Sequence, residues 1–263
     1  MAILIRRLAA ALLGLAMLAT PAFAVFGGKP VAPSDLPAKA LAAVLYRTAD
    51  GAHLCTALAL APRLMLTAAH CTDGGASATR LIFATTLVDV PPSQLRDVAA
   101  IARAPRTTGA KGSFAYDNPD DLALLVLASD VPKGTVFASL GQGDGTGTVR
   151  IAGYGATSDL RGVVGNGQRG FDGILHLAVT TLTTRGPALV ADQSGAAGMC
   201  TGDSGGPAFT VAGRTLRVAG VLIGVSAPRS ASDFCRGSAH FASIDRWRDW
   251  IVATARRLGQ PLR

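Results

Sequence analysis

Two short motifs in the sequence hold residues that could carry out nucleophilic catalysis together. Residues 200–207 read Cys-Thr-Gly-Asp-Ser-Gly-Gly-Pro, and residues 66–71 read Leu-Thr-Ala-Ala-His-Cys. A serine hydroxyl is a poor nucleophile until a base removes its proton, and a histidine, which titrates near neutral pH, can be that base. Ser204 and His70 are therefore the candidate nucleophile and base.

A carboxylate must complete such a unit, because it holds the imidazole in the required tautomer. Asp121 lies between the two motifs and directly precedes the apolar run at 122–127. This position would put its carboxylate at the edge of a core strand. The chain order His70, Asp121, Ser204 is the order found in chymotrypsin-like enzymes.

At these residues the chain resembles the trypsin/chymotrypsin family of serine proteases, from about residue 25 to the C-terminal segment. The resemblance implies that Ser204 attacks the peptide carbonyl, that His70 moves the proton and that Asp121 orients His70. The family pattern places this Asp directly before the apolar run, which favours Asp121 over Asp120. The backbone N–H groups of Gly202 and Ser204 would form the oxyanion hole, where loss of one donor typically costs about 2.7–4 kcal/mol.

The remaining histidines, His53, His176 and His240, are expected to be surface or strand residues. One alternative uses His240, because Gly-Asp-Ser-Gly-Gly also fits the G-x-S-x-G turn of α/β-hydrolases, in which the acid and the His follow the Ser. Ser204, Asp233 and His240 have that order. However, few residues follow Ser204, no series of βαβ units precedes it, and the motif around His70 would be left unexplained.

Residues 1–24 have the three parts of a secretory signal peptide. Arg6 and Arg7 supply positive charge, Leu8–Leu18 is apolar, and Ala22-Phe-Ala24 is a small-x-small cleavage site. The apolar run is short for a membrane span, which favours cleavage over an uncleaved anchor. We therefore expect a secreted or periplasmic protein without stable membrane insertion after cleavage.

Cleavage after residue 24 would leave Val25-Phe-Gly-Gly28 as the N-terminus. Family members begin with a similar sequence, and in them the new ammonium pairs with the Asp before the catalytic Ser. The resemblance thus implies an ion pair between Val25 and Asp203, because a buried ammonium needs a carboxylate partner. We expect no propeptide, so that signal peptidase itself makes the activating cut; otherwise Gly27-Gly28 would be merely a turn.

Four cysteines in an exported chain allow three disulfide pairings. Spacing favours Cys55–Cys71 and Cys200–Cys235, and the second would brace the wall of the substrate pocket. Each would contribute about 3 kcal/mol by restricting the unfolded chain. A metal site is the alternative, but the cysteines lack C-x-x-C spacing. Residues 74–92 also lack an acidic calcium loop, so we expect no metal and no cofactor.

The substrate pocket departs from the pattern of tryptic enzymes, in which an Asp six residues before the catalytic Ser binds Lys or Arg. Gly198 stands in that place and Met199 follows it. Alignment gives Val225 and Ala239 as pocket walls. Since no fixed negative charge is visible, we expect a non-tryptic enzyme that prefers small or medium apolar side chains before the cut bond.

A second departure concerns the hydroxyl group that supports the catalytic Asp in the family. One alignment places Ile223 at that position, and a shifted alignment offers Ser226. With Ile223 there, Asp121 would lose one hydrogen bond.

Composition limits the classes of function. The chain has 263 residues, of which 49% are hydrophobic and 16% charged, so a sizeable core is expected and disorder is not. The net charge of +8 is dispersed except for a basic cluster near the C-terminus, and nothing resembles a nucleic-acid reader. We expect a protein or peptide substrate and no nucleic-acid partner. The sequence does not identify an inhibitor.

Short apolar segments between Gly-rich turns predict an all-β fold. The expected strands are 40–46, 53–61, 63–67, 81–90, 97–103, 122–127, 149–153, 174–181, 207–211, 216–223 and 240–244. The resemblance implies one protease domain at 25–263, with two six-stranded antiparallel β-barrels at about 25–140 and 141–244. A C-terminal α-helix is expected at about 245–258, where Trp247, Trp250, Ile251 and Leu258 form an apolar stripe.

The sequence therefore predicts a secreted serine endopeptidase that acts through a Ser-His-Asp acyl-enzyme mechanism. The alternative is a weakly active or inactive protein of the same fold that binds or regulates. Inactive relatives usually lose a triad residue or the oxyanion glycine, and this chain retains both.

Overall fold

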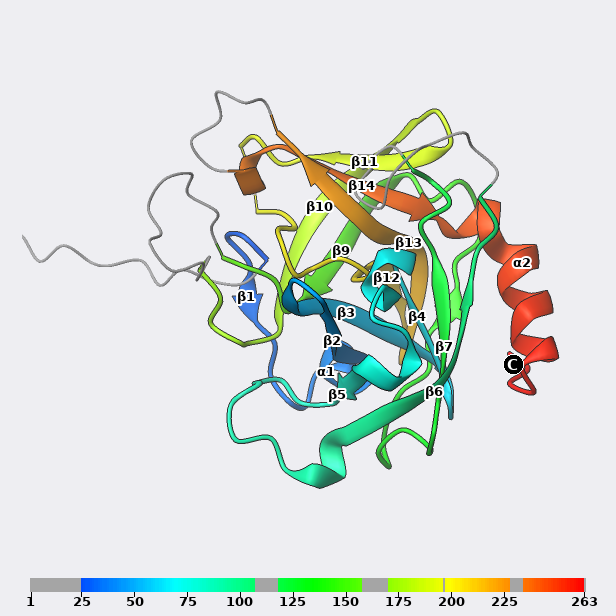
Figure 1. Cartoon of the computed structure of the whole chain (residues 1–263). Helices are drawn as coiled ribbons and strands as arrows, with labels where there is room; N and C mark the ends of the chain where they lie inside the picture. The colour runs from blue at the N-terminus through cyan, green and yellow to red at the C-terminus, as the bar shows by residue number, and fades with distance from the viewer. Residues whose placement is uncertain (1–24, 107–117, 158–169, 196, 228–233, 263) are drawn as a thin grey trace, which may run out of the picture.

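The computed structural model describes residues 25–106, 118–157, 170–195, 197–227 and 234–262, which form two β-barrels and a C-terminal helix (Figure 1). The predicted signal peptide at 1–24 and most of the Gly-rich segment 159–171 lie outside these residues.

The first barrel is a closed ring of six antiparallel strands in the order β2-β3-β4-β7-β6-β5. The strands are β2 (Leu41–Thr48), β3 (Gly51–Ala61), β4 (Leu64–Thr67), β5 (Thr79–Ile82), β6 (Leu95–Arg103) and β7 (Ala123–Leu127). The short helix α1 (Leu36–Ala40) precedes β2, and short helical turns lie in the connections after β4 and β5: η1 (Ala69–Thr72), η2 (Ala76–Ala78) and η3 (Pro92–Gln94).

Strand β7 is apolar at every position because both of its faces are buried. Leu125 and Leu127 belong to the core inside the first barrel. Leu124 and Val126 belong to a second core, which also contains Phe209 of the other barrel. The unbroken apolar run that follows Asp121 is thus a strand packed between two cores.

The second barrel also closes through six strands, since β9 pairs with both β10 and β12. The ring consists of β9 (Gly147–Gly153), β10 (His176–Arg185), β11 (Ala188–Asp192), β14 (Ser238–Ser243), β13 (Thr215–Ser226) and β12 (Pro207–Ala212). Strand β1 (Lys29–Pro30) extends β10, β8 (Ser139–Leu140) pairs in parallel with β13, and η4 (Phe234–Arg236) precedes β14.

The strand predicted at 81–90 is shorter in the structure, where β5 ends at Ile82. Asp89 has a positive φ of 53°, and two prolines follow it, so the chain cannot continue an extended ladder there. The segment instead contacts the second barrel: Leu87 N–H donates to Gly173 O at 2.8 Å, and Leu175 N–H donates to Thr85 O at 2.8 Å.

The C-terminal helix α2 (Ile244–Arg257) covers the side of the molecule at the right of Figure 1. Its buried stripe includes Trp247 and Ile251 at the spacing expected for one helix face. Trp247 Nε1–H donates to Pro119 O at 2.8 Å, so the helix also fixes the segment that leads to Asp121.

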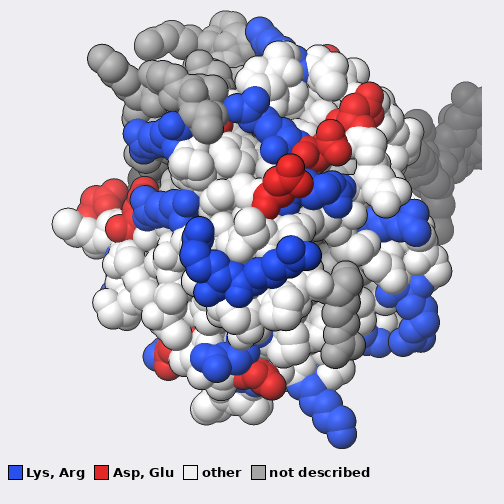
Figure 2. Space-filling model, turned by 90° about the vertical axis from the view of Figure 1, so that its right-hand side faces the viewer, with Lys and Arg blue, Asp and Glu red and all other residues white. Residues whose placement is uncertain are grey.

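Figure 2 views the face that carries α2. Basic side chains are spread over this face and acidic side chains lie among them, as on a solvated surface of mixed charge. Within the described ranges, no helix combines the length and the apolar character needed to cross a membrane.

Candidate active site

His70 and Asp121 meet at the ends of neighbouring strands in the first barrel. His70 lies in η1, directly after β4, and Asp121 lies before β7, which pairs with β4. Asp121 Oδ2 lies 2.6 Å from His70 Nδ1, and its Oδ1 accepts the His70 backbone N–H at 2.9 Å. Because the carboxylate binds Nδ1–H, the ring presents its basic lone pair on Nε2.

Asp120 makes different contacts. Its side chain is buried, and its Oδ1 lies 3.5 Å from a guanidinium nitrogen of Arg246 in α2. Of the two neighbouring carboxylates, the structure therefore brings Asp121 to His70 and directs Asp120 to the C-terminal helix.

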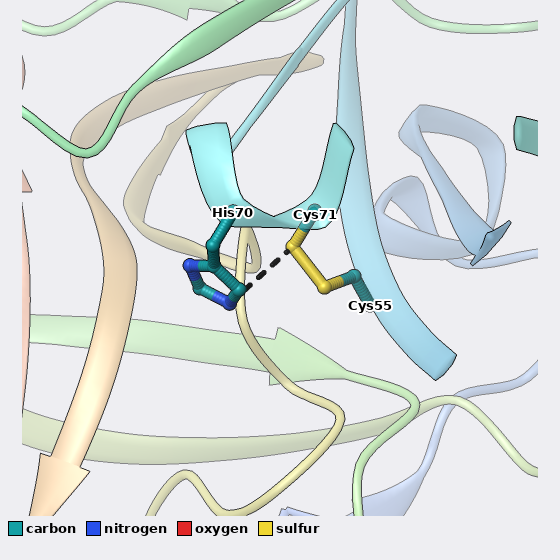
Figure 3. Close-up of side chains that lie close together, drawn as sticks. All are labelled: Cys55, His70 and Cys71. Carbon is teal, nitrogen blue, oxygen red and sulfur yellow. Dashed lines mark hydrogen bonds between the residues drawn. A yellow bond between two sulfur atoms is a disulfide. The ribbon is translucent and has the colours of Figure 1, made fainter. Parts of the chain in front are cut away.

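Ser204 belongs to the second barrel, but its backbone is bonded to the first. Thr56 N–H in β3 donates to Ser204 O at 2.8 Å. The disulfide between Cys55 and Cys71 lies beside this contact, and Figure 3 shows it next to the ring of His70. The nucleophile candidate is thus anchored one residue from a disulfide whose other end adjoins the base candidate.

Cys55, His70 and Cys71 lie close enough together to suggest a metal site. However, the two sulfur atoms are bonded to each other, and a disulfide offers no thiolate to a metal. The second disulfide joins Cys200 to Cys235, between the segment before Ser204 and η4.

Gly205 allows the two barrels to approach each other at Ser204. Its φ is +80°, and an added Cβ would lie 2.1 Å from Thr67 Oγ1 and 2.2 Å from Thr56 O. Thr56 was not identified from the sequence, yet its polar groups join both barrels. Its carbonyl accepts the Thr67 hydroxyl at 2.8 Å, and its own Oγ1 accepts Tyr154 N–H at 3.2 Å.

Asp203 is fully buried beside Ser204. Its carboxylate oxygens accept the backbone N–H groups of Gly155 at 2.7 Å and Cys200 at 2.8 Å. Burial raises the pKa of this carboxyl from 3.8 to about 7, although the two hydrogen bonds act in the opposite direction. Among the described residues, no cationic side chain forms an ion pair with it.

Val25 is also fully buried, and Gly198 N–H donates to Phe26 O at 2.8 Å. In the intact chain the Val25 nitrogen is an amide, and the described contacts include no ion pair between Val25 and Asp203. The structure thus buries Val25. The ion pair between the Val25 ammonium and Asp203 stays a prediction for the cleaved chain.

The buried carboxyl of Asp203 predicts that the uncleaved chain loses stability as the pH rises. The folded state holds a proton up to a pKa of about 7 and the unfolded state only up to 3.8, so between these values the folded state binds more protons. Stability should fall by about 4 kcal/mol across this window. Differential scanning calorimetry of a chain that begins Met-Val25 should show the fall, and Asp203→Asn should flatten it. If the stability of the Met-Val25 chain and that of its Asp203→Asn variant depended equally on pH, Asp203 would not be the cause of the fall.

A cleft with a volume of about 1080 Å³ contains both His70 and Ser204. Its lining comprises Leu45, Tyr46, Ala52, His53, Leu54, Cys55, His70, Leu87, Val88, Phe171, Asp172, Gly173, Cys200, Thr201, Gly202, Ser204, Leu222, Ile223, Gly224, Val225, Ser226, Ala227 and Phe234. Phe171, which is 41% exposed, lies over Gly202: an added Cβ on that glycine would be 2.7 Å from the aromatic ring.

The pocket residues expected from the sequence do not all reach this cleft. Val225 lines it, whereas Gly198, Met199 and Ala239 are buried and absent from its wall. Ala239 pairs with Val225 across the sheet and therefore sits behind it. The pocket role of Gly198, Met199 and Ala239 therefore stays a prediction.

The contacts of Ser226 bear on its suggested support of Asp121. Its Oγ lies 2.7 Å from His240 Nε2, so the described hydrogen bond of Ser226 is to His240. Ile223 lines the cleft and is buried.

His53 Nε2 lies 2.7 Å from Thr48 Oγ1. Asp233, the acid of the hydrolase-type alternative, lies outside the described residues.

Comparisons with known proteins agree with this geometry. The model of the family described as Trypsin matches residues 25–251. The chain is 30% identical over 219 residues to a trypsin-like protease of Streptomyces glaucescens, an alignment that covers 78% of this chain and 75% of that protein. It is 26% identical over 257 residues to the fibrinolytic enzyme, isozyme C, of Lumbricus rubellus, an alignment that covers 84% of this chain and 98% of that protein.

Proposed function

This chain belongs to the trypsin family, and we propose that it is a secreted, non-tryptic member whose peptidase activity depends on Ser204, His70 and Asp121. The serine endopeptidase activity follows from the family. The observation that carries the assignment of residues is the 2.6 Å contact between Asp121 Oδ2 and Nδ1 of His70, which lines the same cleft as Ser204.

In the proposed mechanism, Ser204 Oγ attacks the carbonyl carbon of the peptide bond while His70 Nε2 takes its proton. The backbone N–H groups of Gly202 and Ser204 stabilise the oxyanion of the tetrahedral intermediate. His70 then gives the proton to the leaving amine, and an acyl-enzyme remains on Ser204. Water, activated by His70, hydrolyses this ester by the same steps in reverse.

Covalent labelling distinguishes this proposal from a weakly active protein that only binds or regulates. A fluorophosphonate reacts with an activated serine, so it should label Ser204 stoichiometrically, and peptide mapping should locate the adduct. The Ser204→Ala variant is the control and should stay unlabelled. A folded mature protein that does not react would contradict the proposed activity.

We propose secretion because residues 1–24 combine a basic start, an apolar run and a small-x-small site. Two further observations support it. The family match begins at residue 25, directly after the expected cleavage site. The chain also forms two disulfides, which persist in oxidising compartments. N-terminal sequencing of the exported protein should give Val25 as the first residue.

The proposed specificity excludes basic side chains before the cut bond. Among the described residues that line the cleft, Asp172 is the one carboxylate. It lies beside Phe171, on the Gly202 side, and its Oδ2 is 3.5 Å from His176 Nε2. The wall formed by Val225 and Phe234 is apolar, and an apolar wall offers no partner to a buried ammonium or guanidinium.

We expect peptides with Ala, Val or Leu before the cut bond to be hydrolysed at least about tenfold faster, as kcat/KM, than peptides with Lys, Arg or Asp. Profiling of a peptide library by mass spectrometry would measure this preference directly. Cleavage dominated by Lys and Arg would refute the proposed specificity. Cleavage dominated by Glu would point to the pair of Ser226 and His240 as a binding site for a carboxylate.

A further inference from the structure

The cleft lining includes one residue from each of two segments that the disulfide between Cys200 and Cys235 joins. Cys200 and Phe234 line it, whereas Met199 and Cys235, their neighbours in the sequence, do not. The side chain behind both is Gln193, which follows β11 and is fully buried. No sequence motif pointed to this residue.

The amide group of Gln193 bridges these two segments. Its Oε1 accepts Met199 N–H at 2.6 Å, and its Nε2 donates to Met199 O at 2.9 Å and to Cys235 O at 2.8 Å. These partners fix the amide orientation, because a flipped amide would face two carbonyls with its own oxygen. The backbone N–H of Gln193 also donates to Gly237 O at 2.9 Å.

Gln193 also fills the space that a side chain at position 198 would need. A Cβ added to Gly198 would lie 2.2 Å from Gln193 Cδ and 2.5 Å from its Cγ. The absence of a side chain at Gly198 therefore does not lengthen the pocket. The volume is occupied by an uncharged amide whose hydrogen bonds are all directed to the backbone.

We propose that Gln193 is a specificity-determining residue that closes the floor of the pocket for the side chain before the cut bond. The floor lies directly behind Cys200 and Phe234, so the pocket accepts Ala or Val and rejects the longer Met and Phe. This inference rests on the proposed peptidase function and adds to it the residue that limits pocket depth.

Two substitutions separate the volume of Gln193 from its hydrogen bonds. Gln193→Ala removes the floor, so kcat/KM for Phe relative to Ala substrates should rise at least about tenfold, since even one methylene group in an apolar pocket changes discrimination by roughly 10–200-fold. Gln193→Leu has a similar volume and no amide, so it should keep the preference of the unaltered enzyme. Both variants should melt at lower temperature, because both leave backbone groups unpaired. Ser194→Ala, at the exposed neighbour, is the control.

A merely structural role would lower the activity of both variants without changing the ratio between substrates, and that result would overturn the proposal. Rates are expressed per fluorophosphonate-reactive site, so loss of folded enzyme does not alter the ratio. If Gln193→Ala does not fold, the unaltered enzyme decides: peptide phosphonates with Ala should label Ser204 at least about tenfold faster than those with Phe. Equal labelling rates would overturn the proposal that Gln193 limits the depth of the pocket. No reaction with the fluorophosphonate would instead refute the proposed peptidase function itself.

Discussion

Ser204→Ala and His70→Ala should each lower kcat for peptide hydrolysis by about 10⁴–10⁶-fold, and the double variant should lose no more than either alone. The nucleophile and the base act in one step, so removing either leaves the same residual activity from binding and the oxyanion hole. Initial rates on a chromogenic peptide amide, measured with the mature enzyme, test this. Near-native turnover by His70→Ala, or losses that multiply in the double variant, would contradict the assignment.

The two neighbouring carboxylates offer a matched comparison. Asp121→Asn should lower kcat by about 10⁴-fold, because an amide favours the wrong histidine tautomer. The same substitution at Asp120, which contacts Arg246 rather than His70, should preserve most of the activity. The reverse outcome would assign the orienting role to Asp120.

Adding one residue before Val25 should lower activity by about 10²–10⁴-fold. Removing one member of a buried ion pair typically costs about 3–5 kcal/mol, and each 1.36 kcal/mol is a factor of about ten. A chain that starts Met-Val25 moves its ammonium away from Asp203, which is fully buried beside Ser204. We expect the carboxylate to lose its partner and the oxyanion hole at Gly202 to lose its geometry.

The control for this experiment is Val25→Ile at the mature N-terminus, which keeps the free ammonium and should stay active. Activity per milligram and fluorophosphonate labelling should fall together in the Met-Val25 protein, while its disulfides remain intact. Full activity with the added Met, or an exported protein that begins at another residue, would refute the activation mechanism.

The sequence predicted the architecture well where apolar runs are long. Five of the six first-barrel strands and helix α2 lie within a few residues of the predicted ranges, because their apolar faces are buried in continuous cores. Strand β11 was missed. Its run Ala188–Asp192 is short and follows Gly186-Pro187, and it becomes a strand through its pairing with β10 and β14, which local sequence does not encode.

The sequence was less informative about the pocket. Motifs identified Ser204 and His70 because their neighbours have distinctive types, whereas the depth of the pocket depends on which side chain fills the space next to Gly198. Gln193, earlier in the same connection between β11 and β12, fills it, and a lone glutamine carries no pattern. Thr56 was missed for the same reason: its contacts with Ser204 and Tyr154 exist only when the barrels meet.

The bond between Thr56 and Ser204 has a mechanical consequence. The nucleophile and the base come from different barrels. Even so, the carbonyl of Ser204 is bonded to strand β3, and Cys55 of that strand forms the disulfide with Cys71, next to His70. The two barrels are joined a second time near the rim, where Leu87 N–H donates to Gly173 O and Leu175 N–H donates to Thr85 O. A rotation of one barrel against the other would have to break hydrogen bonds at both places. The gap across which the proton passes is therefore held by two separate connections between the barrels.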